Sequence, residues 1–156
     1  MRVLLICLAI VTAGPVSALS CMRPDAVRLF EQARDGKDAF YIVTGRIHLL
    51  EAPNIPKPGA KTPERTRARI TGQALSSSGF NAPFDREVMV EATCLASWCG
   101  SPEGLSGALI MAIKIEFETL TLRVGPCGGD QVTWDQLSED RLLTCHLDGV
   151  CEPAEF

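Results

Sequence analysis

The chain carries seven cysteines in 156 residues, and their placement constrains the fold more than any other feature of the sequence. The first of them, Cys7, lies in an apolar N-terminal stretch that follows Arg2 and is too short to span a bilayer. Small residues end this stretch at Ala18. These features are typical of a secretory signal peptide, which we expect to occupy residues 1–18 or, in the alternative, residues 1–20.

Six cysteines remain beyond this segment, and an even number in a short exported chain predicts three disulfides with no thiol left over. They are Cys21, Cys94, Cys99, Cys127, Cys145 and Cys151. Disulfides persist in oxidising compartments, so we expect a periplasmic or secreted protein. The cysteine spacing alone leaves the connectivity open.

Residues 19–156 are enough for a single domain with a packed core, which the disulfides supplement. Without Arg2, 14 basic residues face 19 acidic ones, so the net charge changes from −4 for the full chain to −5. A net negative charge disfavours nucleic acid and anionic membranes as partners. Beyond the signal peptide, no second apolar run approaches the length of a membrane span.

Runs rich in β-branched residues and alternating apolar and polar residues predict five strands. The expected strands cover residues 39–49, 67–74, 88–94, 108–116 and 120–124. Residues 51–64 are rich in proline and are expected to form a loop. Residues 76–86 contain Ser, Gly, Asn and Pro, and we expect them to form the turn between the second and third strands.

A helix is expected on each side of the strands. Pro24 and Asp25 begin the first helix, and Gly36 ends it. Thr133 begins the second helix with a capping box and Cys145 lies near its end. Five strands with two helices predict a mainly β fold, a five-stranded OB-like barrel with an N-terminal and a C-terminal helix, stabilised by disulfides. The expected core residues are Val27, Phe30, Ile70, Val88, Val90, Leu109, Met111, Ile113, Leu120 and Leu122.

Several short motifs of residues 21–127 follow an order known from one family. They are a cysteine at the mature N-terminus (Cys21) before a short helix, a strand ending in V-x-G-x-I (Val43, Gly45, Ile47), a Cys-Gly pair (Cys99, Gly100), a glycine before an apolar strand (Gly107) and a closing cysteine (Cys127). In this order the chain resembles the netrin-like barrels of the tissue inhibitors of metalloproteinases. It is also similar to small exported proteobacterial proteins of unknown function.

The resemblance implies an inhibitor that acts through its N-terminus. In the family, the first cysteine places its α-amino group and carbonyl on the zinc of a metalloprotease, and a disulfide to the Cys-Gly cysteine holds it rigid. Here this requires cleavage after Ser20, so that Cys21 becomes the first residue. The chain departs from the family because the inhibitors begin Cys-x-Cys, whereas Arg23 stands at the third position, and because Cys94 is extra.

The resemblance also suggests a pairing of the cysteines. Cys21 would pair with Cys94 or Cys99, and Cys127 would take the other of the two. The remaining pair, Cys145 and Cys151, would clamp the C-terminal tail.

Other motifs favour structural over chemical roles. Trp98 and Cys99 resemble the start of a thioredoxin-like redox motif, but Pro102 stands where the second cysteine is needed, so we expect a disulfide beside a core tryptophan. Cys145 and His146 lack a second ligand pair at zinc-finger spacing. We therefore expect no enzyme activity, no cofactor and no metal site. The basic residues between 57 and 69 are expected to form a solvated face.

These features predict an exported, non-enzymatic binding protein for an unknown protein or small molecule, with no nucleic-acid or membrane partner. One alternative is a metalloprotease inhibitor that acts through the Cys21 N-terminus. A second alternative is a lipoprotein anchored at Cys21. The residues before Cys21 match a lipobox poorly, and lipidation would leave five cysteines and one unpaired thiol.

Overall fold

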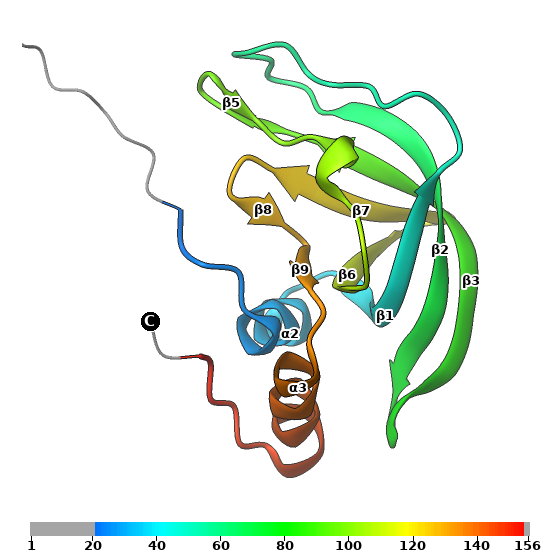
Figure 1. The fold of residues 1–156 in the computed structure, drawn as a ribbon, viewed down its shortest axis with the longest axis vertical. Helices are drawn as coiled ribbons and strands as arrows, with labels where there is room; N and C mark the ends of the chain where they lie inside the picture. Colours follow the sequence, from blue (N-terminus) through cyan, green and yellow to red (C-terminus); the bar gives the residue numbers. More distant parts are fainter. Residues whose placement is uncertain (1–20, 155–156) are drawn as a thin grey trace, which may run out of the picture.

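The computed structural model describes residues 21–154, so the expected signal peptide at residues 1–18 lies outside the described part of the chain. Figure 1 shows a barrel with two helices packed against one side of it. The strands are β1 (Ala39–Leu49), β2 (Glu64–Ser76), β3 (Gly79–Ala92), β4 (Cys94–Leu95), β5 (Trp98–Cys99), β6 (Leu109–Glu116), β7 (Thr119–Gly125), β8 (Gly128–Gly129) and β9 (Gln131–Thr133). The helices are α2 (Ala26–Asp35) and α3 (Gln136–Asp148), with a 3-10 turn at Pro102–Gly104.

Five strands close the barrel. Antiparallel pairs join β1 to β2, β2 to β3, β1 to β6 and β6 to β7, and a parallel pair joins β3 to β7. The short strands β8 and β9 lie beside β7 and β6. The connectivity confirms the predicted fold class, a mainly β, five-stranded OB-like barrel with a helix on its N-terminal side and another on its C-terminal side.

Residues 42–43 of β1 and 109–113 of β6 are buried on both faces of the sheet. Val43 and Met111 point into the barrel interior, whereas Ile42 and Ile110 pack against the two helices. This arrangement explains why residues 109–113 form an unbroken apolar run and do not alternate with polar residues. The two helices therefore cover a second hydrophobic layer outside the barrel.

The predicted core is confirmed for most of its members. The buried residues among those predicted are Val27, Phe30, Ile70, Val88, Val90, Leu109, Met111, Ile113 and Leu122. Leu120 is the exception, because it is only partly buried and packs against the edge of the barrel core.

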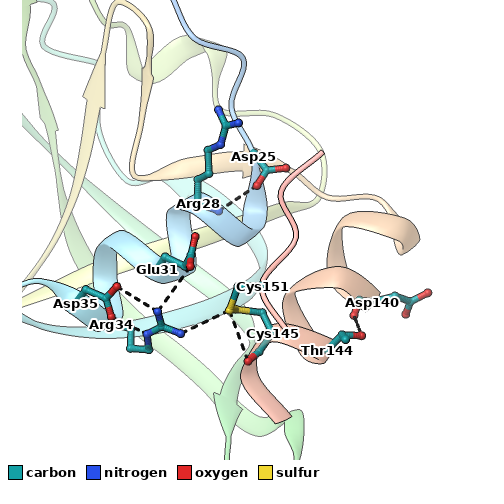
Figure 2. Close-up of a disulfide and its surroundings, with 9 residues drawn as sticks. All are labelled: Asp25, Arg28, Glu31, Arg34, Asp35, Asp140, Thr144, Cys145 and Cys151. Atoms are coloured by element: carbon teal, nitrogen blue, oxygen red, sulfur yellow. Dashed lines mark hydrogen bonds and ion pairs between the residues drawn. A yellow bond between two sulfur atoms is a disulfide. The ribbon is translucent and has the colours of Figure 1, made fainter. Parts of the chain in front are cut away.

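Asp25 caps the N-terminus of α2, which confirms the predicted start of this helix, and it also binds the C-terminal tail. Its Oδ1 accepts a hydrogen bond from the backbone N–H of Arg28 at 3.0 Å, as Figure 2 shows. Its Oδ2 accepts another from the backbone N–H of Ala154 at 3.0 Å. The same carboxylate therefore caps the helix and connects it to the last described residue.

The prediction of a turn at residues 76–86 was wrong. The strand β3 begins at Gly79, so only residues 77–78 connect β2 to β3. Pro83 lies inside β3, where it is tolerated because only β2 pairs with that part of the strand. Phe84 is buried and shows that this segment contributes to the core.

The predicted cap of the second helix was also wrong. Thr133 belongs to β9, where it pairs with Leu109, and Asp135 caps α3 instead. The hydrogen bond from the Ser138 hydroxyl to Asp135 lowers the pKa of this carboxyl. The helix continues three residues beyond Cys145 and ends at Gly149 in the left-handed conformation.

Replacing Gly72 by alanine is expected to destabilise the barrel. Gly45 and Gly72 face each other across β1 and β2, and a Cβ on Gly72 would lie only 2.0 Å from the carbonyl oxygen of Thr44. Because backbone must move to make room, we expect the free energy of unfolding to fall by about 2–3 kcal/mol, measured by urea denaturation. Gly104→Ala is the matched control, since no atom lies within 4 Å of its Cβ position. Equal stability of the two variants would contradict this explanation of the glycine pair.

Candidate functional site

The six cysteines of the described chain form three disulfides. The pairs are Cys21–Cys127, Cys94–Cys99 and Cys145–Cys151. The predicted tail bridge is confirmed, but the predicted partner of Cys21 was wrong. The reason lies in a local hairpin: β4 and β5 place Cys94 directly opposite Cys99, with their Cα atoms 4.0 Å apart.

This pairing changes the comparison with the inhibitors. In that family, the Cys-Gly cysteine anchors the first cysteine of the mature chain, whereas here Cys99 is already bonded to Cys94. Cys21 instead bonds to Cys127, which follows β7. The disulfide that the resemblance implied for the N-terminus is therefore absent from residues 21–154.

The disulfides indicate an oxidising environment of the extracellular type. Within residues 21–154, neither helix has the length and apolar character needed to cross a membrane. The same residues contain no cluster of three or more His, Cys, Asp or Glu side chains that could hold a metal ion.

The hairpin of β4 and β5 exposes two large apolar side chains. Leu95 and Trp98 are cross-strand partners, and they are 54% and 57% exposed. The expectation of a core tryptophan was therefore wrong. The Cys94–Cys99 disulfide closes the hairpin immediately below this pair.

Neighbouring segments hold the hairpin in place. The backbone N–H of Gly59 donates a hydrogen bond to the carbonyl of Ala96 at the hairpin tip, at 2.9 Å. The Sγ of Cys94 lies 3.5 Å from the carbonyl oxygen of Lys57 in the same loop. At the base, the N–H of Gly100 donates to the carbonyl of Thr93 at 2.9 Å. Figure 1 shows this hairpin and the loop between β1 and β2 projecting at the same end of the barrel.

The loop adds apolar and basic side chains to this end of the molecule. Ile55 is 51% exposed, and Lys57 and Lys61 form no ion pair with any described residue. We call Leu95 and Trp98, with these three loop residues, the hairpin surface. It combines rigid apolar side chains with two unpaired positive charges.

The outer face of β2 has a different character, because its arginines are paired with carboxylates. The Nε of Arg69 lies 2.7 Å from Asp85, and the hydrogen bond from Arg69 lowers the pKa of that carboxyl. The Nε of Arg67 lies 3.1 Å from Glu51, whose pKa is lowered chiefly by a hydrogen bond from the Arg67 backbone N–H.

Arg65 completes the row through Glu91, with its Nε 2.7 Å from the carboxylate. OB barrels that bind single-stranded nucleic acid use unpaired cations with stacking aromatic rings. All three arginines of this row are neutralised by acidic neighbours. The face therefore offers little attraction to a polyanion.

The two histidines of the described residues lie in different surroundings. His48 is exposed on β1. His146 lies on α3 beside an apolar cavity. Its neighbour Cys145 is bonded to Cys151. The hairpin surface itself was missed, although four residues between Cys94 and Cys99 are a length that suits a disulfide-closed hairpin.

Comparisons with protein-family models, with curated proteins and with solved structures gave no match to this chain. The barrel is therefore established by its connectivity, and the argument about function depends on the geometry of its surfaces.

Proposed function

We propose that the chain is an exported, non-enzymatic binding protein that recognises a partner protein through the hairpin surface. The observation that carries this proposal is the pair Leu95 and Trp98, more than half exposed on a hairpin closed by a disulfide. Tryptophan is among the residues that contribute most to protein interfaces, and a rigid hairpin loses little conformational entropy on binding. Lys57 and Lys61 favour a partner whose apolar pocket has an acidic rim.

The place of action follows from the same features. Three disulfides support an oxidising compartment, and the expected signal peptide would deliver the chain to the periplasm or outside the cell. A partner in either compartment would meet the hairpin surface directly.

A netrin-like relationship remains part of the proposal, supported by the closed barrel with its two helices. We favour the hairpin surface over the inhibitor mechanism, because Cys21 is bonded to Cys127 and not to Cys99. The lipoprotein alternative is less favoured for a related reason: acylation would need the Cys21 sulfur, which the disulfide occupies.

Photocrosslinking from the hairpin tip tests the proposal. Ser97, between Leu95 and Trp98, is replaced by p-benzoylphenylalanine in cells of the source organism. We expect one defined crosslinked protein, identified by mass spectrometry. With that protein purified, Trp98→Ala should weaken binding at least tenfold, a loss of about 1.4 kcal/mol, because it removes the apolar anchor.

Ser77 is the matched control position. It lies in the turn between β2 and β3, which Figure 1 places at the end of the barrel away from the hairpin. The same crosslink from both serines, crosslinks to lipid, or unchanged affinity of the Trp98→Ala variant would each count against a protein partner at the hairpin surface.

A further inference from the structure

A second site, separate from the hairpin surface, is a cavity of about 520 Å³ between α2, α3 and the start of β1. We call it the helix pocket. It shares no residue with the hairpin surface. The lining residues that matter here are Phe30, Ala33, Arg34, Phe40, Leu75 and His146. Its volume falls within the range of roughly 300–1,000 Å³ that is typical of small-molecule sites.

Aromatic rings form much of the wall of the helix pocket. Phe30 is buried, and its ring meets the ring of His146 edge-on, with the centroids 5.6 Å apart. Phe40 lies on the same face of β1 as Ile42 and packs against this cluster. The Tyr41 ring lies on the other face of β1, where it meets Phe84. Because Phe30 and His146 contact each other, this part of the wall is formed before any ligand arrives. Such a wall suits a planar aromatic ligand, which can stack on one ring and meet another edge-on.

His146 supplies a polar group with a defined proton. Its Nε2 lies 2.8 Å from the carbonyl oxygen of Ser76. Because a carbonyl oxygen can only accept, Nε2 carries the hydrogen, and in the neutral form of the imidazole Nδ1 is then an acceptor. Within residues 21–154, Nδ1 has no hydrogen-bond partner. The ring can therefore accept a hydrogen bond from an N–H or O–H group of a ligand.

Among the described residues that line the helix pocket, Arg34 is the one Lys or Arg side chain, and acidic neighbours already neutralise it. Arg34 donates hydrogen bonds to both oxygens of Asp35, from Nε at 2.7 Å and from Nη2 at 3.1 Å. Its Nη2 also lies 3.7 Å from Glu31, and Figure 2 shows all three side chains together beside the sulfur of Cys151. The hydrogen bond from Arg34 lowers the pKa of Asp35, which keeps this carboxyl ionised. Two carboxylates face one guanidinium, so this rim gives no net attraction to an anion.

We infer that the helix pocket binds a small, uncharged aromatic molecule that carries a hydrogen-bond donor. The rings supply the contact area, His146 supplies the acceptor, and the Arg34 cluster disfavours negative charge. This site goes beyond the proposed recognition of a protein partner.

Two fluorescent probes with the same ring system test the inference on the exported chain with its disulfides intact. N-phenyl-1-naphthylamine is uncharged, and 8-anilinonaphthalene-1-sulfonate adds one negative charge to the same skeleton. We expect saturable binding of one uncharged probe per chain, at least tenfold tighter than binding of the sulfonate. Ala33→Phe, which fills the helix pocket from α2, should weaken binding of the uncharged probe at least tenfold.

A second variant and a control separate loss of the site from loss of the fold. Phe40 is only partly buried, so Phe40→Ala should leave the protein folded and still weaken binding of the uncharged probe severalfold. Trp98→Ala should bind the probe like the unmodified chain, because Trp98 lies outside the helix pocket. Equal affinity for the two probes, unchanged binding by folded Ala33→Phe and Phe40→Ala, loss of binding in Trp98→Ala, or a dimer that buries the helix pocket would overturn the inference.

Discussion

Replacing Cys21 and Cys127 together by serine is expected to lower the free energy of unfolding by about 4.7 kcal/mol in the chain-entropy model of disulfide stabilisation. The bridge joins residues 106 positions apart, so its loss frees the long loop of residues 21–127 in the unfolded state. It also attaches the segment before α2 to the turn after β7. The change is measured by urea denaturation of the double variant against the unmodified chain.

The hairpin bridge provides the comparison. Cys94 and Cys99 are five positions apart, so the corresponding double serine variant is expected to lose only about 2 kcal/mol. The tail bridge is a poorer control, because Cys145 is buried and a serine there would add a desolvation cost. An equal loss of stability in the two double variants would contradict the dependence on loop length. A small loss for Cys21 and Cys127 would show that the N-terminal segment is held mainly by α2.

Much of the fold could be predicted because the strands alternate or carry long apolar runs. The first strand was predicted with its observed bounds, residues 39–49, from β-branched and aromatic residues alone. The segment at residues 76–86 was missed because Gly79, Asn81 and Pro83 are turn formers in isolation. In the barrel, this part of β3 pairs on one side only, so the missing N–H of Pro83 has less effect on the sheet.

The candidate sites were harder to predict than the barrel. Trp98 was expected in the core because large aromatic residues beside a disulfide are usually buried, but the short β4–β5 hairpin carries it away from the barrel. The partner of Cys21 depends on which loops meet in three dimensions, and sequence spacing does not contain that information. The helix pocket is a tertiary feature of the same kind, since α2, β1 and α3 bring Phe30, Phe40 and His146 together from distant parts of the chain.

Phe30→Ala is expected to lower the free energy of unfolding by about 3–5 kcal/mol, the range for truncating a buried phenylalanine. The ring is only 7% exposed and lies in the cluster that joins the two helices to the outer face of β6. Its loss would leave a void that His146 cannot fill, because the Nε2–H of that ring is held by the Ser76 carbonyl. The variant is measured by thermal and urea denaturation.

Two further variants decide what the loss at Phe30 means. Phe30→Leu keeps most of the apolar volume and should cost less than about 1.5 kcal/mol, whereas Leu147→Ala on the exposed side of α3 should change little. An unchanged melting temperature for Phe30→Ala would show that α2 is not packed on the barrel. Because Phe30 lines the helix pocket, Phe30→Leu should also weaken binding of the uncharged probe. The loss of binding free energy should exceed the loss of unfolding free energy in the same variant. That combination would distinguish a ring used for a ligand from one used only for packing.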